Sequence, residues 1–211
     1  MLPRRLVPLS AMLLVACDPV FGDGVHDNTD YFPLDGAARV ASYRSASGAM
    51  DWTLELQKAD TSTVDGIEVV TLEYFDATSS DLLWQVRWSS DAIHGVRIHG
   101  FTDVQGQDEV VFDTPVVLIE RGVQSEPVVT ETNGFTFTAS AGSHDGCETF
   151  WMPAWSDESC LVVSLSDADG LPGTHGVITG EYRLVPSYGP AWLDLDAYDD
   201  AWWMSDFDWE E

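Results

Sequence analysis

The chain has 211 residues, of which 9 are Lys or Arg and 36 are Asp or Glu, and its formal net charge is -27. Nucleic-acid backbones and anionic lipid headgroups both attract clustered basic side chains, so this charge excludes nucleic-acid recognition and adsorption through a basic patch. Basic proteins, cations and neutral ligands stay compatible with it. Hydrophobic residues make up 45% of the chain, enough to build a core in the single domain that this length suits.

Residues 1–16 have the pattern of a secretory signal peptide. Arg4 and Arg5 precede a mostly apolar run that is too short to span a bilayer, which takes roughly 20 residues. The run ends in Leu14-Val15-Ala16-Cys17, which resembles the lipobox of bacterial lipoproteins. The resemblance implies that Cys17 is acylated on its sulfur and anchors the mature chain to a membrane of the bacterial cell envelope. The alternative is an ordinary secretory signal with a chance cysteine near its cleavage site.

Cys147 and Cys160 are the two cysteines that follow. In an oxidising exported compartment such a pair usually forms a disulfide, and closing this loop is worth about 3 kcal/mol in the chain-entropy account. A zinc site is disfavoured because neither cysteine lies in a CxxC pair or beside a His at ligand spacing. A catalytic cysteine is disfavoured because no neighbouring residue type marks a reactive thiol. We therefore predict a disulfide.

Residues 17–30 are rich in Gly and Asp and are interpreted as a polar tether between the lipid and the domain. Asp23, Asp27 and Asp30 offer oxygen ligands for Ca²⁺, although a solvated linker is the simpler interpretation. The stretch Asp167-Ala168-Asp169-Gly170 resembles the start of a calcium loop, but it lacks the third ligand and the distal Glu, which favours a β-turn. No other cofactor or metal is expected.

Residues 31–195 contain short segments of alternating apolar and polar side chains, separated by Gly, Asp, Ser and Asn. This pattern is typical of antiparallel β-structure, and we expect an all-β fold, either an antiparallel sheet, a sandwich or a partly open barrel. Pro115 and Pro127 are expected at strand starts or edges. The expected strands are 50–58, 66–75, 82–89, 93–101, 109–120, 134–139, 160–165 and 176–185.

Two short motifs in this domain resemble a group of bacterial lipoproteins without a known activity. Tyr31-Phe32-Pro33-Leu34 resembles their opening, in which a glycine turn and an aromatic-rich strand follow, and Gly180 to Pro190 resembles their closing strand. The sequence departs from the group at Ala38-Arg39-Val40, where its members usually carry Trp. The resemblance covers residues 31–195 and implies a β-rich exported domain.

Residues 196–211 are acidic and aromatic, with no Lys or Arg. Such segments are often disordered until they bind, so Trp202, Trp203 and Trp209 are candidate partner-binding residues and a basic envelope protein is the matching partner. A short helix is the alternative, because apolar side chains recur every three to four residues. We expect a deletion from Asp199 to change the free energy of unfolding by about 1 kcal/mol or less.

The sequence holds none of the common hydrolase, metalloprotease or nucleotide-binding motifs. His94 and His99 are five residues apart in a strand-like segment, which places them on opposite faces and is poor geometry for one metal. Catalytic triads are assembled across a fold, so the adjacent residues Ser143-His144-Asp145 are interpreted as a turn. No catalytic residue is assigned.

Three functions are compatible with these features. The first is a membrane-anchored envelope protein with a β-rich binding or scaffolding domain. The alternatives are a secreted hydrolase or carbohydrate-active protein with an unrecognised site, and a carrier of an apolar ligand. A deep pocket floored by Trp84, Trp88 or Trp151 would indicate the enzyme, and an open interior would indicate the carrier. The same tryptophans facing a closed core would indicate the scaffold.

Overall fold

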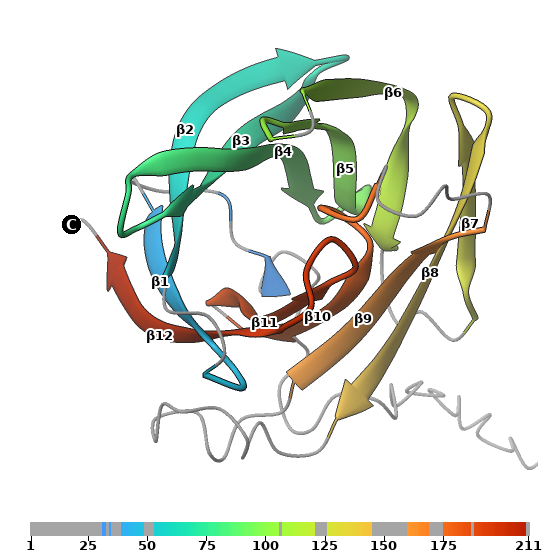
Figure 1. Cartoon of the computed structure of the whole chain (residues 1–211). Coiled ribbons are helices and arrows are strands. Elements are labelled where there is room, and N and C mark those ends of the chain that lie inside the picture. The colour runs from blue at the N-terminus through green and yellow to red at the C-terminus, as the bar shows by residue number, and fades with distance from the viewer. Residues whose placement is uncertain are drawn as a thin grey trace, which may run out of the picture.

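The computed structural model describes residues 31–32, 34, 39–48, 53–105, 107–120, 126–144, 160–168, 175–186 and 188–209. Within these residues twelve strands form one sheet, and every registered pair of strands is antiparallel. The sheet curls into a nearly closed, barrel-like ring (Figure 1). The all-β prediction is confirmed. The described residues contain no helix that is long and apolar enough to cross a membrane.

The strands follow one another around the ring, and the sheet order is β6-β5-β4-β3-β2-β1-β12-β11-β10-β9-β8-β7. Each of the eight expected segments overlaps an observed strand. The strands are β1 (Arg39–Ser45), β2 (Leu54–Val64), β3 (Ile67–Asp76), β4 (Asp81–Asp91), β5 (Gly95–Asp103), β6 (Asp108–Ile119), β7 (Val128–Thr132), β8 (Phe135–His144), β9 (Cys160–Asp167), β10 (Gly180–Val185), β11 (Gly189–Leu195) and β12 (Trp202–Trp209). Because β8 extends to His144, the prediction of a turn at Ser143-His144 is wrong.

Local sequence explains both the strands and two of the turns between them. In β4 the alternate residues Trp84, Val86 and Trp88 are buried, as the period of two in the sequence predicts. Asp65-Gly66 joins β2 to β3 and Asn133-Gly134 joins β7 to β8, and all four residues have positive φ. Two-residue hairpins need this conformation because its twist matches that of the flanking strands.

Aromatic side chains and the start of the described chain fill the interior of the ring. The blue segment at residues 31–32 lies inside the ring in Figure 1, and Phe32 has no exposed surface. Its ring centroid lies 4.6 Å from that of Trp88. Nζ of Lys58 donates a hydrogen bond to the carbonyl oxygen of Leu34 at 3.0 Å, which fixes the same segment to β2. The Tyr-Phe-Pro-Leu motif therefore contributes core residues to the ring.

The prediction of a separate tail at 196–211 is corrected by β12. This strand pairs with β1 on one side and β11 on the other, so it lies within the sheet. Trp202 and Met204 have no exposed surface, while Asp206 points outward and is exposed. Alternation explains the outcome, because it buries the apolar side chains and keeps this carboxylate in water. Helical spacing and disorder were the wrong interpretations.

The two ends of the sheet, β6 and β7, meet at a seam. Unlike the other junctions of the ring, this seam is held by side chains of β7 and its turn. The backbone N–H of Val117 donates to Thr130 Oγ1 at 3.2 Å, and that of Thr114 donates to Thr132 Oγ1 at 3.0 Å. Asn133 accepts from the backbone N–H of Asp113 at 2.8 Å. Since these two strands end the sheet order, Pro115 lies in an edge strand, as predicted. Pro127 directly precedes β7, also as predicted.

Candidate binding surface

The interior tryptophans belong to a closed core. Trp84 and Trp88 are almost fully buried, and the ring of Trp84 stacks on Tyr74 with centroids 4.6 Å apart. Trp84 also lies against Trp202, at 6.3 Å. These two indoles therefore pack against other core rings and do not floor an enzyme cleft. Trp151, the third residue in that hypothesis, lies outside the described residues.

A buried Ser–His pair joins β4 to β5. Nε2 of His99 lies 2.8 Å from Oγ of Ser89, and Ser89 has no exposed surface. Burial lowers the pKa of His99, and the positive charges of Arg97 and Arg87 lower it further. A catalytic serine has to be accessible to its substrate, and in a catalytic triad an acid orients the histidine. This pair instead satisfies two buried polar groups where the register between β5 and β6 is irregular.

A second buried pair joins the end of β9 to the turn before β10. Nδ1 of His175 lies 2.5 Å from Oδ2 of Asp167, and both side chains are almost fully buried. Phe101, Phe135 and Phe137 surround the imidazole edge-on, with centroids 5.8, 4.4 and 5.1 Å away. Asp167 was the first residue of the calcium-loop resemblance, and here it orients a histidine. Nε2 of His175 has no hydrogen-bond partner among the described residues.

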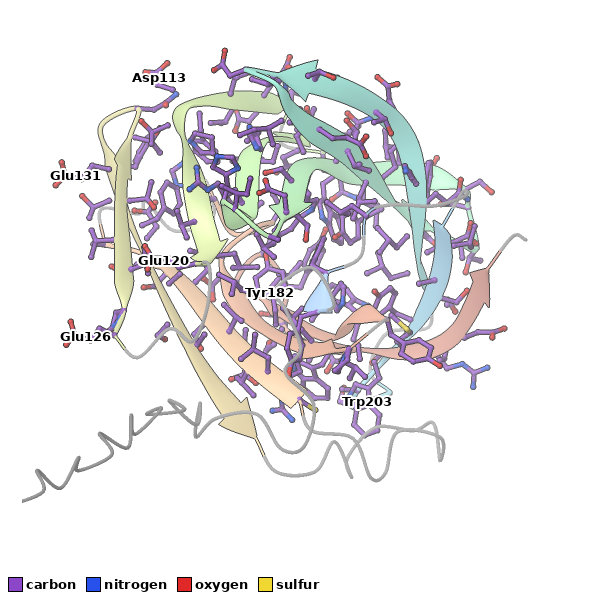
Figure 2. All side chains as sticks on the ribbon, turned by 180° about the vertical axis from the view of Figure 1, so that it is seen from behind. Asp113, Glu120, Glu126, Glu131, Tyr182 and Trp203 are labelled. Atoms are coloured by element: carbon purple, nitrogen blue, oxygen red, sulfur yellow. The ribbon has the colours of Figure 1, made fainter. Side chains whose placement is uncertain are left out.

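The outer face of the sheet carries a row of four side chains, one from each of four neighbouring strands. The register places Arg44 of β1 opposite Trp203 of β12, Trp203 opposite Trp192 of β11, and Trp192 opposite Arg183 of β10. Figure 2 shows Trp203 outside the sheet, whereas Tyr182 lies within the ring. We call these four residues the Arg–Trp row.

Contacts within the row hold its side chains in place. The indole rings of Trp192 and Trp203 have centroids 5.4 Å apart and are tilted by 39°. The guanidinium carbon of Arg183 lies 4.7 Å from the Trp192 centroid, within the range of a cation–π contact. Nε of Arg183 also donates to Oε1 of Glu181 at 2.9 Å. Arg183 is thus held between a carboxylate and an indole.

A hollow of about 350 Å³ opens at the Arg44 end of the row. Its described lining consists of Arg44, Ser45, Ala46, Trp203 and Ser205, which combine an indole with hydroxyl and guanidinium groups. Nε1 of Trp203 is buried and has no hydrogen-bond partner among the described residues. The hollow therefore offers an apolar ring and several polar groups at one place, as small-molecule sites do.

Negative charge accumulates beside the row. Glu181 and Asp194 face each other across β10 and β11. Burial raises the pKa of the Asp194 carboxyl, Glu181 and Asp196 raise it further, and Arg183 acts in the opposite direction. A polyanion approaching this face would be repelled by these carboxylates as well as by the net negative charge of the chain.

The other predicted site residues are distributed as follows. Trp202 is a core residue, so its assignment as a partner-binding residue is wrong, whereas Trp203 is on the outer face. Cys160 begins β9 and is buried opposite His144. Cys17, Cys147, Asp23, Asp27, Asp30 and the side chain of Trp209 lie outside the described residues, so their roles stay predictions. Sequence reasoning missed Trp192, although the alternation across residues 189–195 marks it as an outward residue.

No group of three His, Cys, Asp or Glu side chains suited to a metal ion occurs in the part of the chain that the structure describes. Comparisons of the chain with protein-family models, with curated proteins and with solved structures give no match.

Proposed function

We propose that this protein is a lipid-anchored protein of the bacterial cell envelope whose β-rich domain binds its ligand on the outer face of the sheet. Residues 1–16 would direct export, Cys17 would carry the lipid, and residues 17–30 would connect it to the ring. Several acyl chains anchor a protein stably where a single chain is marginal. The domain would then be held near the membrane and present the Arg–Trp row to other envelope components.

The observation that supports a binding domain best is the contrast between its interior and its outer face. Phe32, Trp84 and Trp88 fill the interior, which disfavours a carrier of apolar ligands and an enzyme with its site inside the ring. On the outside, Trp192 and Trp203 are only partly buried and lie side by side. Aromatic side chains with a polar edge are favoured at binding surfaces.

The disulfide between Cys147 and Cys160 belongs to the same proposal, because it presupposes export. Cys160 begins the strand that pairs with β8, so the bond would tie the long connection after β8 to the sheet. We expect non-reduced protein from the envelope to show no alkylatable thiol at these two positions by mass spectrometry. Two free thiols in the native exported protein would contradict this part.

Anchoring is tested by growing cells with a clickable fatty-acid analogue. The natural chain should be labelled and should sediment with membranes, and Cys17→Ser should lose the label. Equal labelling of both proteins would contradict the anchor.

Binding is tested in cells by placing a photoreactive phenylalanine analogue at position 203. Position 111 serves as the matched control, because Val111 is 56% exposed on β6, away from the row. We expect a discrete cross-linked product from position 203 that is absent from position 111. Identical products, or none, would refute a binding role for this face.

A further inference from the structure

We propose that the Arg–Trp row binds an uncharged saccharide chain, with Trp203 as the platform on which a sugar ring stacks. This inference rests on the proposed function, since it names the ligand class of the same face. A pyranose ring has an apolar side made of C–H groups and a rim of hydroxyls. Its recognition therefore needs an exposed aromatic face with hydrogen-bonding groups around its edge.

Trp203 is the better platform of the two indoles. Arg183 already covers one face of Trp192, and the Trp192 ring supports Trp203 from the side at 5.4 Å. Because Glu181 holds the Arg183 guanidinium, this side of the site is fixed before a ligand arrives. A platform ordered in advance loses little conformational freedom on binding, which favours affinity.

The polar groups around Trp203 match a rim of hydroxyls. Ser205 and Ser45 contribute hydroxyl groups to the hollow, and Arg44 contributes a guanidinium group. Both hydroxyl groups already donate, from Ser45 to Asp200 and from Ser205 to the carbonyl oxygen of Ser42, so their oxygens can accept from sugar hydroxyls. The guanidinium group supplies donors in a planar arrangement. The volume of about 350 Å³ lies near the lower end of known ligand sites, which suits a sugar ring or the end of a chain.

Charge selects an uncharged ligand over the other candidates. A polyanionic glycan would approach a chain of net charge -27 and would meet Asp194 and Glu181 beside the row. A basic peptide would be attracted at long range, but at the hollow it would meet the guanidinium of Arg44 beside the Trp203 platform. Like charges opposed at an interface are unfavourable, so polyanionic and basic ligands are both disfavoured relative to a neutral ligand.

The test is isothermal titration of the purified full chain with hexasaccharides of N-acetylglucosamine, of β-1,4-linked glucose and of α-1,4-linked glucose. Hexalysine and a heparin hexasaccharide are the charged comparisons. We expect at least one neutral hexasaccharide to bind, and Trp203→Ala to weaken it roughly tenfold or more, as truncation of a central aromatic does. Trp203→Phe should recover part of the affinity, and Val111→Ala should change nothing.

Two further variants keep the test decisive if Trp203→Ala lowers the melting temperature. Arg44→Gln and Ser205→Ala alter the hollow at partly or fully exposed positions, and each should weaken saccharide binding by a few fold. Absence of binding to all three neutral hexasaccharides would overturn the ligand class, as would affinities that none of the variants changes. Preferential binding of hexalysine or heparin would also overturn it. A protein adduct at position 203 in cells, together with no saccharide binding, would reject the saccharide while the binding domain stands.

Discussion

The ring is completed at two places that use different chemistry. At the β1–β12 junction, where the first and last of the described strands meet, all seven residues of β1 have a partner in β12, with one bulge between Ser42 and Tyr43. At the β6–β7 seam, consecutive strands approach without a registered backbone pairing, and Thr130, Thr132 and Asn133 supply the hydrogen-bonding atoms instead. The junction between strands that are far apart in the sequence is thus formed by backbone pairing, whereas the seam between consecutive strands relies on side chains.

This difference shows how a sheet can end without exposing its edges. The backbone N–H groups of β6 would be unpaired at an edge and would invite pairing with another chain. Side chains of β7 and its turn accept from three of these donors, the N–H groups of Asp113, Thr114 and Val117. The amide of Asn133 also donates to the carbonyl oxygen of Val111 at 2.8 Å. Proline at position 115 brings no N–H of its own, so it leaves one donor fewer to satisfy.

Removing β12 should have the largest effect of any change considered. Trp202→Ala takes a fully buried indole away from Trp84 and Tyr198, and large-to-small core substitutions of this kind cost about 3–5 kcal/mol. A deletion from Asp199 would also leave β1 and β11 without their common neighbour, so we expect no cooperative urea transition. This replaces the expectation of a change of about 1 kcal/mol. A deleted chain that unfolds at the parent midpoint would show that the β1–β12 junction is dispensable.

The next largest effect is expected behind the seam, at the buried pair of Asp167 and His175. Asp167→Ala removes the partner of a buried histidine, which costs about 3–5 kcal/mol. Asp91 is the surface comparison, because its carboxylate lies 3.0 Å from Nδ1 of His94 and also accepts from the backbone N–H groups of Ile93 and His94. Asp91→Ala should cost about 1–2 kcal/mol, most of it from these backbone hydrogen bonds. Equal losses in urea midpoint for the two variants would mean that burial does not set the strength of the pair.

The sequence predicted the strands whose alternation is strong and missed those whose cue is a turn or a register. β4 is read directly from alternate apolar residues, and its burial pattern agrees. β7 was missed because it has only five residues, although Asn133-Gly134 after it is a hairpin signal. β12 was misread because its acidic composition resembles that of disordered segments, while its period of two was overlooked.

The Arg–Trp row could not be derived from the sequence. Arg44, Trp203, Trp192 and Arg183 become neighbours only through the pairing of β1 with β12 and of β12 with β11. No local pattern fixes which strands pair when more than a hundred residues separate them, because the pairing depends on how the whole sheet curls. His175 and Asp167 are only eight residues apart, but no pattern in the sequence marks them as a buried pair.

Smaller effects are expected from the seam itself. Thr130→Val and Thr132→Val keep the side-chain shape but remove the acceptors for the N–H groups of Val117 and Thr114. Each loss of a hydrogen bond should cost about 1 kcal/mol. Thr71→Val on β3 is the control, since Thr71 has a backbone-paired strand on each side, with Asp60 and Arg87 as its partners. If both seam variants match the Thr71→Val control in urea midpoint, the seam does not depend on these hydroxyl groups.

The smallest expected effect is a pH dependence of stability that distinguishes the β1–β12 junction from the β6–β7 seam. Asp200 accepts hydrogen bonds from the hydroxyl groups of Ser45 and Ser47, at the end of β1. Burial would raise the pKa of its carboxyl, but these bonds and those from the backbone N–H groups of Ser47 and Ala201 outweigh burial, so the pKa is lowered.

A carboxyl whose pKa is lowered by folding stabilises the folded state at pH values above its ordinary pKa, which is 3.8 for Asp. This contribution is lost as the pH falls through the pKa of the folded state. Asp200→Asn should therefore lower the free energy of unfolding at pH 7 by about 0.5 kcal/mol, after allowance for solvent screening. The difference from the parent should shrink as the pH falls, because protonation of the parent carboxyl removes the same contribution. Thr130 and Thr132 do not titrate, so the cost of the seam variants should be the same at both pH values. Urea midpoints measured at pH 7 and pH 2.5 compare the two junctions, and a pH-dependent cost at the seam with a constant cost at Asp200 would reverse this assignment.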